Sequence, residues 1–136
     1  MKESTVAINV LESEDGSEHT VVSFDDASKQ LCIDRRASGR SDFADGFAAV
    51  HCAPLQLYRE GEVELLVVVD SSSVEAFGEG GKAAVTDLVY PNADSVRVSL
   101  SLPKTAKSEA ESLKIYKLNS AYESDLAFVY PHQKRN

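Results

Sequence analysis

The sequence predicts one all-β domain, an antiparallel two-sheet β-sandwich of the jelly-roll or concanavalin-like kind with about ten short strands. Three observations predict this fold. Short runs rich in Val, Ile, Leu and Phe alternate with polar residues, as half-buried strands do. Turn signals made of Gly, Asp, Ser and Pro separate these runs about every 8–12 residues. The length of 136 residues, with 43% hydrophobic and 26% charged side chains, suits a single domain with its own core.

The first half of the chain divides into short strands between polar turns. The Asp15-Gly16 pair is a typical hairpin signal between the first two runs. A loop rich in Gly, Ser and charged residues follows the third run, and its irregular pattern does not fit a helix. Strands are expected at Thr5–Leu11, His19–Phe24, Gln30–Asp34, Phe47–His51 and Leu55–Arg59.

The second half is organised around Val63–Phe77, VELLVVVDSSSVEAF. Its β-branched run predicts a buried strand, Asp70 opens a polar turn, and a second strand continues to Phe77. Further strands are expected at Lys82–Tyr90, Val96–Leu102 and Leu113–Leu118, with Val96, Val98, Leu100 and Leu102 facing inward. Residues 1–120 are expected to form the sandwich, and 121–136 a C-terminal tail that is partly packed or mobile.

Charge and composition argue against several classes of function. A formal net charge of −8 and a pI of about 4.8 do not suit nucleic-acid binding, because affinity for phosphates requires clustered Lys and Arg. No apolar run approaches the ~20 residues that cross a bilayer, and the N-terminus lacks the apolar segment of a signal peptide. We therefore expect a soluble chain with neither a membrane nor a nucleic-acid partner, whose localisation the sequence leaves open.

The sequence contains no motif for a metal, a cofactor or a redox site. Cys32 and Cys52 are not part of a C-x-x-C pair, and the pattern favours two separate core thiols over a disulfide. The three His residues have no neighbours at metal-ligand spacing. The GEGGK segment at 78–82 lacks the helix and the Ser or Thr of a phosphate-binding loop, so it predicts a hairpin turn.

Three segments resemble the C-terminal β-sandwich of glycoside hydrolase family 32, which contains invertases, levanases and inulinases. These segments are LCIDRRASGRSDF, HCAPLQL and VELLVVVDSSSVEAFGEGGKAAVTDLVYP, and the resemblance extends over roughly Val6–Leu118. Carbohydrate-binding module family 66, which binds fructans, shares these features. The Asn-Asp-Pro-Asn, Arg-Asp-Pro and Glu-Cys motifs of the family's catalytic propeller do not occur here. The resemblance therefore implies a non-catalytic accessory module, whose partner is the catalytic β-propeller of the same enzyme.

Asp70 and Glu75 stand in the best-matching segment, and more than one interpretation is open. In a structural interpretation, Asp70 accepts hydrogen bonds from the backbone of Ser72 and Ser73, and Glu75 pairs with Arg35. In a second, these carboxylates bind a ligand. Catalysis is disfavoured, because a retaining glycosidase needs two carboxyl groups about 5–5.5 Å apart in an open cleft that nothing else in this chain supplies.

The candidate carbohydrate-binding residues are charged hydrogen-bonding groups with one aromatic wall. The chain has no Trp, so we expect an end-on pocket for a fructose unit rather than a flat stacking platform. Ser71 stands where the family usually has Arg. The absence of the forked donors of Arg weakens the case for sugar binding at that point. The candidates are Asp34, Arg35, Asp70, Glu75 and Tyr90.

A sandwich that packs on a propeller is also expected to carry an apolar or aromatic patch. The possible contributors are Phe43, Phe47, Tyr58 and Tyr122. Two alternatives to the accessory module stay open at this point. One is a free-standing fructan-binding module, and the other is a structural or protein-interaction sandwich without a ligand.

Overall fold

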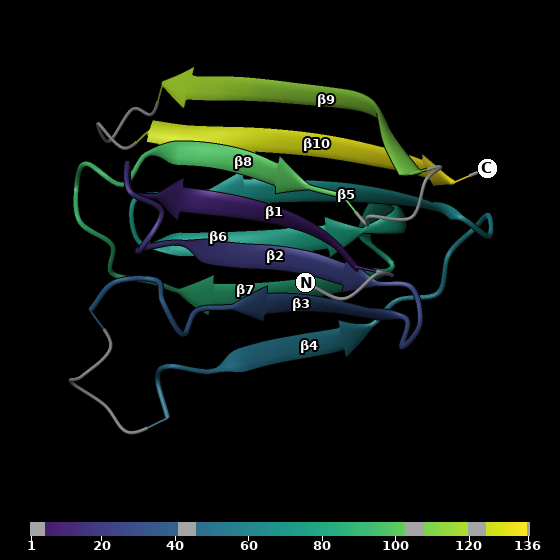
Figure 1. Ribbon diagram of the computed structural model, residues 1–136, viewed down its shortest axis with the longest axis horizontal. Coiled ribbons are helices and arrows are strands. Elements are labelled where there is room, and N and C mark those ends of the chain that lie inside the picture. The colour runs from purple at the N-terminus through teal and green to yellow at the C-terminus, as the bar shows by residue number, and fades with distance from the viewer. Residues whose placement is uncertain (1–4, 41–45, 103–107, 120–124, 136) are drawn as a thin grey trace.

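Two antiparallel β-sheets packed face to face form the molecule, as predicted (Figure 1). The computed structural model describes residues 5–40, 46–102, 108–119 and 125–135, and the side chains of the first two of these ranges. The first sheet has the order β4-β3-β2-β1-β8 and the second the order β7-β6-β5-β10-β9. The strands of the first sheet are β1 (Thr5–Glu12), β2 (Thr20–Asp25), β3 (Gln30–Asp34), β4 (Val50–Pro54) and β8 (Arg97–Ser101). Those of the second are β5 (Glu62–Val69), β6 (Ser73–Gly78), β7 (Ala83–Leu88), β9 (Ser108–Asn119) and β10 (Asp125–Arg135).

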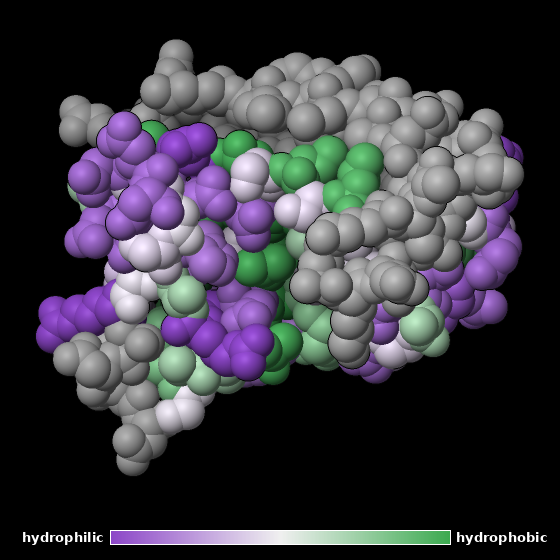
Figure 2. All heavy atoms as spheres, viewed as in Figure 1, coloured by the Kyte–Doolittle hydropathy of each residue, from purple (hydrophilic) through white to green (hydrophobic). Residues whose placement is uncertain are grey.

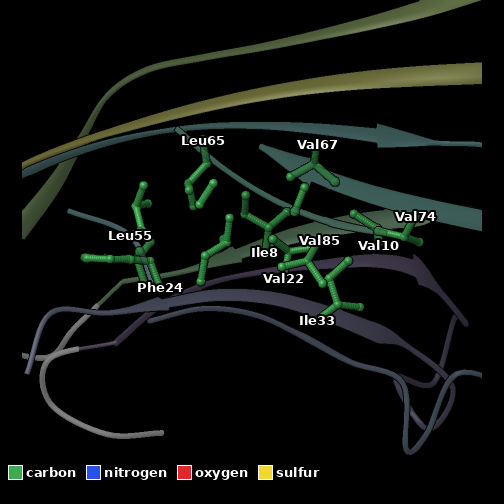
Figure 3. Close-up of a cluster of buried hydrophobic side chains, with 14 of the residues drawn as sticks. Ile8, Val10, Val22, Phe24, Ile33, Leu55, Leu65, Val67, Val74 and Val85 are labelled. Carbon is green, nitrogen blue, oxygen red and sulfur yellow. The ribbon is translucent and has the colours of Figure 1, made fainter. Parts of the chain in front are cut away.

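Alternating burial along the strands builds the core between the sheets. In β2, Val22 and Phe24 point inward while their neighbours are half-buried on the outer face, and β7 alternates buried and exposed residues throughout. Aliphatic side chains from both sheets and the ring of Phe24 fill the space between the sheets (Figure 3). This packing is the main stabilising contribution that the sequence pattern encodes.

The predicted turns are confirmed where glycine permits a left-handed backbone. Gly16 has a φ of +78° in the β1–β2 hairpin, and its N–H donates to the Ser13 carbonyl at 3.0 Å. The GEGG segment contains a short 3₁₀ turn, η1 (Glu79–Gly81), in place of a phosphate-binding loop. The carboxylate of Glu79 is buried and accepts hydrogen bonds from the N–H groups of Glu64, at 2.7 Å, and Tyr58, at 3.3 Å. This turn therefore fixes the connection that leads into β5.

Three details of the predicted strands are wrong. The strand expected at 47–51 begins at Val50, and no strand forms over 55–59. In that segment the buried Leu55 donates its N–H to the carbonyl of Lys29 at 2.9 Å, outside any sheet ladder. Val96 is 72% exposed rather than inward-facing, because β8 begins only at Arg97. Val98, Leu100 and Leu102 do pack against the core.

The C-terminal part of the chain contributes more strand than the sequence analysis predicts. Strand β9 begins at Ser108 instead of Leu113, and residues 125–135 of the expected tail form β10. This strand pairs with β5 on one side and β9 on the other, so it lies inside the second sheet (Figure 1). The ladder between β10 and β5 joins segments that are far apart in the sequence, and no local pattern marks such a pairing.

The prediction of two separate core thiols is wrong. Cys32 of β3 and Cys52 of β4 are directly opposite each other in the antiparallel ladder, with their Cα atoms 4.1 Å apart, and they form a disulfide. Both residues alternate with inward-facing neighbours, so the disulfide lies on the outer face of the first sheet. It links the edge strand β4 to the rest of that sheet.

Candidate functional site

Arg35 forms the centre of a polar cluster at the end of the sandwich where β3 and β7 finish. Its backbone N–H donates to the carbonyl of Ala49 at 3.0 Å, which continues the pairing of β3 and β4 one residue beyond Asp34 and Val50. Its guanidinium crosses to the second sheet, where Nη1 donates to the Leu88 carbonyl at 2.9 Å and lies 3.8 Å from Oδ1 of Asp87. Asp87 points inward because it continues the alternation of β7. The arginine therefore ties the two sheets together.

Two aromatic rings extend the cluster, the first in contact with this guanidinium and the second in contact with the first. The Arg35 Cζ lies 3.8 Å from the ring centroid of Phe47, a cation–π geometry. The Phe47 ring in turn lies 5.7 Å from the ring of Tyr90, with 32° between the planes. Phe47 is buried and Tyr90 is 42% exposed, so the stack leads from the interior to solvent. An exposed aromatic edge beside a charged hydrogen bonder suits a ligand that carries both apolar and hydroxyl faces.

His51 completes the polar part of the cluster. Its Nδ1 lies 2.7 Å from Oδ1 of Asp87, and its side chain is about half exposed. Asp87 Oδ2 and Arg35 Nε are buried and have no hydrogen-bond partner in the part of the chain that the structure describes. A buried carboxylate oxygen without a donor costs free energy, so the hydrogen bonding of the Asp87 carboxylate is incomplete within the described residues.

The loop after Arg35 holds Tyr90 in place by a close backbone approach. Arg40 N–H donates to the Tyr90 carbonyl at 3.0 Å. Gly39 has a φ of +121°, and a Cβ at this position would lie 2.4 Å from the Tyr90 carbonyl oxygen and 2.8 Å from the Pro91 Cα. Only glycine allows both the backbone angle and the contact. Glu18 secures the next residues, since its carboxylate accepts from the N–H of Asn92 at 3.0 Å.

The structure brings together two of the five predicted site residues. Arg35 and Tyr90 share the cluster through Phe47. Asp34 is next to Arg35 in the chain, but its carboxylate accepts from the Arg36 guanidinium, with Oδ2 2.7 Å from Nη2. That hydrogen bond, opposed by partial burial, holds the pKa of Asp34 below its ordinary value.

Asp70 and Glu75 lie apart from this cluster. Asp70 is in the β5–β6 turn, where its Oδ1 accepts from the N–H of Ser71 at 2.7 Å, so the expected bonds from Ser72 and Ser73 are wrong. The turn is at the same end of the sandwich as Arg35, because the Ser72 carbonyl accepts from Val89 N–H at 2.9 Å. Glu75 alternates with buried residues of β6 and faces outward, while its expected partner Arg35 pairs with Asp87.

His51, Asp87 and the role of Phe47 are missing from the residues predicted for the site. The alternation of β7 places Asp87 at an inward position. An inward carboxylate requires a partner, so this position is the sequence signal that indicates a polar cluster here. The partners are Arg35, which directly follows β3, and His51 of β4, both on the other sheet, and their positions depend on how the sheets pack. Figure 2 shows the surrounding surface: hydrophilic residues gather at the left end of the view, where β1 and β3 finish in Figure 1.

The cluster contains hydrogen-bonding groups, charges and aromatic rings. In the described parts of the chain, no three His, Cys, Asp or Glu side chains gather closely enough to hold a metal ion. The same residues contain no helix of the length and apolarity needed to span a membrane.

Comparison with known proteins gives a consistent family match. A protein-family profile described as "Glycosyl hydrolases family 32 C terminal" matches residues 2–117. An extracellular exo-inulinase of Aspergillus awamori is 36% identical over 121 residues, which cover 89% of this chain and 22% of the relative. A levanase of Bacillus sp. (strain L7) is 34% identical over 115 residues, which cover 84% of this chain and 12% of the relative.

Solved structures match the same fold. The crystal structure of the exo-inulinase from Aspergillus awamori superimposes with a TM-score of 0.72 and 29% identity, covering 98% of this chain and 22% of that one. A sucrose-6-phosphate hydrolase from Lactobacillus gasseri, with a TM-score of 0.59 and 17% identity, shares the fold. The chain thus spans about a fifth of the length of the exo-inulinase it matches.

Proposed function

This chain belongs to the family of C-terminal domains of glycosyl hydrolases family 32, and on that premise we propose that it is the non-catalytic accessory domain of a fructan- or sucrose-acting glycosidase. The observation that carries the proposal is the extent of the match. Residues 2–117 correspond to the C-terminal domain, while the chain covers only 22% of the exo-inulinase. The reaction would then be carried out by a separate catalytic β-propeller, on which this sandwich packs.

The outer face of the second sheet supports the packing part of the proposal. Leu66 and Val68 of β5 and Phe77 of β6 alternate with core residues, so their side chains lie on the outer face. Leu66 is directly opposite Phe77 in the ladder, and Val68 is opposite Glu75. The outer face of a sheet in contact with water usually carries polar residues. An apolar group with one carboxylate at this place suits a permanent contact with another domain.

A chimera tests the packing. In the Aspergillus awamori exo-inulinase, this chain replaces the matching C-terminal region, and thermal unfolding is followed by calorimetry. We expect one cooperative transition for the chimera, and a lower or split transition for Val68→Glu. The matched control is Val21→Glu, on the outer face of the first sheet, which should leave the transition unchanged. Equal effects of the two substitutions would contradict packing through the second sheet.

The cluster around Arg35 supports the second part of the proposal, binding of a fructose-containing glycan. Arg35 and Tyr90 supply a charged group and an exposed ring, and the half-exposed imidazole of His51 supplies a further hydrogen-bonding group beside them. Fructose offers several hydroxyl groups and little flat apolar surface, so it depends on such hydrogen bonders more than on ring stacking. Charge-assisted hydrogen bonds contribute roughly 1.5–3 kcal/mol each, so a few of them give weak to moderate affinity after ordering costs.

Calorimetric titration with fructose, levan and inulin tests this binding, with maltose as the control sugar. The proposal predicts binding of the fructose-containing sugars and at least a tenfold loss of affinity for Tyr90→Ala, which removes the exposed wall. Absence of heat at millimolar sugar would favour the alternative of a sandwich that serves packing alone. That alternative has an observation of its own, since Arg35 is already paired with Asp87 across the sheets.

A further inference from the structure

An open pocket lies at the other end of the sandwich from the Arg35 cluster. It has a volume of about 630 Å³ and forms between the β2–β3 turn, the segment that follows β4, and Lys82 after the 3₁₀ turn. The hydrogen bond from Leu55 N–H to the Lys29 carbonyl, at 2.9 Å, holds two of its walls together. The lining residues are Ser28, Lys29, Pro54, Leu55, Gln56, Leu57, Glu60 and Lys82.

The lining combines an apolar wall with side chains that can form hydrogen bonds. Leu55 is buried and Leu57 is half-buried against the core, while Gln56 is exposed. Beside the pocket, the Lys82 ammonium lies 4.3 Å from the ring centroid of Tyr58, which is 71% exposed. Sites for sugars need this combination, since a sugar ring presents both C–H faces and hydroxyl edges.

The charges around the pocket balance one another. The Lys29 ammonium contacts the carboxylates of Asp26 and Glu60, the latter at 2.9 Å, and these two contacts raise its pKa. The ammonium groups of Lys29 and Lys82 and the carboxylate of Glu60 line the opening, and the carboxylate of Asp26 contacts Lys29 from outside the lining, so the two positive charges face two negative ones. A ligand with a net charge gains no net attraction from such a lining, whereas a neutral ligand with many hydroxyl groups can use each polar group.

We propose that this pocket is a second carbohydrate-binding site, which takes a neutral oligosaccharide. It goes beyond the site at Arg35 and does not require that site to function. Strand β3 runs from the pocket to the Arg35 cluster and has five residues. At 3.3–3.4 Å per residue, the two sites are therefore about 17 Å apart. Two sites on one domain would raise its avidity for a polymeric glycan without any new contact at either site.

The experiment is a titration of the ¹⁵N-labelled chain with inulin oligosaccharides, maltotriose and oligogalacturonate, each followed by NMR. We expect saturable shifts of the amides of Gln56, Leu57 and Lys82 with at least one of the two neutral sugars and none with the anionic one. Lys82→Ala should weaken this response about tenfold, because it removes a charged hydrogen-bond donor. The matched control is Arg59→Ala, an exposed cation outside the pocket whose side chain pairs with Glu62.

The outcomes separate this proposal from the proposed function. Shifts at Arg35 and Tyr90 without shifts at Gln56 and Lys82 would overturn the second site and leave the first. A response to oligogalacturonate equal to the response to both neutral sugars would overturn the neutral ligand class. An equal loss with Arg59→Ala would show that general surface charge, and not this pocket, is responsible. Shifts confined to the pocket would support the second site even if the Arg35 cluster binds nothing.

Discussion

Arg35 and Asp87 form an ion pair between the two sheets, with Nη1 3.8 Å from Oδ1 and side chains that are only 13% and 6% exposed. Each of the two residues also makes one further side-chain contact in the cluster. The arginine stacks on Phe47, and the aspartate contacts His51. A buried charge that loses its partner must be desolvated without compensation, so the two residues depend on each other strongly.

Arg35→Met should lower the free energy of unfolding by about 3 kcal/mol, because it leaves the Asp87 carboxylate buried without its cation. The measurement is urea denaturation at pH 7. The double variant Arg35→Met/Asp87→Leu should recover part of the loss. Arg36→Ala is the control, since it removes an arginine that pairs with Asp34 at the surface. Its effect should be much smaller, and a loss as large as that of Arg35→Met would contradict the special position of Arg35.

The Cys32–Cys52 disulfide should stabilise the chain by about 3 kcal/mol, which is the loop-closure estimate for a separation of 20 residues. The double substitution Cys32→Ser/Cys52→Ser should therefore lower the melting temperature, and reduction of the unsubstituted chain should lower it to a similar value. Mass spectrometry with a thiol-alkylating reagent provides the check on the native chain. Two alkylated thiols before reduction would show that the bond does not form.

Gly39→Ala should cost about 3 kcal/mol, since it combines an unfavourable positive φ with a clash against the backbone of Tyr90 and Pro91. Gly16→Ala is the matched control. That residue also has a positive φ, +78°, but open space where the Cβ would be, so about 1 kcal/mol is expected. Denaturation curves of both variants give the comparison. Equal losses would mean that the loop is free to move away from Tyr90.

The sequence predicts the parts of this fold that depend on local pattern. Val22, Phe24, Leu31 and Ile33 alternate along their strands, and the Asp15-Gly16 pair marks its turn, so strands β1 to β3 and their hairpin follow directly. The same reasoning fails for β10, whose place between β5 and β9 is set by long-range pairing. It also fails for Cys32 and Cys52, because the register that puts them opposite each other depends on how the long loop between β3 and β4 returns.

The candidate site shows the same division. Arg35 and Tyr90 lie in one cluster, although nothing in their spacing shows that Phe47 connects them, and their role in binding stays a prediction. Asp70 and Glu75 share a conspicuous segment but lie on a turn and on an outer face. The partner of Arg35 is Asp87, from the opposite sheet, and contacts between sheets are not encoded in any local motif.

The β1–β2 hairpin should have a pH-dependent stability through Asp15. Its carboxylate accepts from the N–H of Ser17 at 3.0 Å, and from the hydroxyls of Ser17 and Ser13, each at 2.8 Å. These bonds, led by the one from the Ser17 backbone, lower the pKa of Asp15 from 3.8 to about 2. A lowered pKa contributes stability that is present above the unfolded-state value and is lost as the pH falls through the folded-state value.

Asp15→Asn should therefore be less stable than the unsubstituted chain at pH 7, and the difference should shrink as the pH falls from about 4 to about 2. Denaturation at pH 7, 5, 4 and 3 follows the trend, and an NMR titration of the Asp15 carboxyl carbon gives the pKa itself. A constant difference at all four pH values, or an ordinary pKa of about 4, would show that the three hydrogen bonds are not formed in solution.

In the proposed function, this chain binds a fructose-containing glycan and another domain hydrolyses it. One NMR sample of the ¹⁵N-labelled chain with an inulin oligosaccharide tests both parts, because amide shifts report binding and the sugar's own proton signals report cleavage. We predict saturable shifts at Arg35, Leu88 and Tyr90, with the oligosaccharide intact after prolonged incubation. Signals of released fructose, or unchanged amides at millimolar sugar, would contradict it.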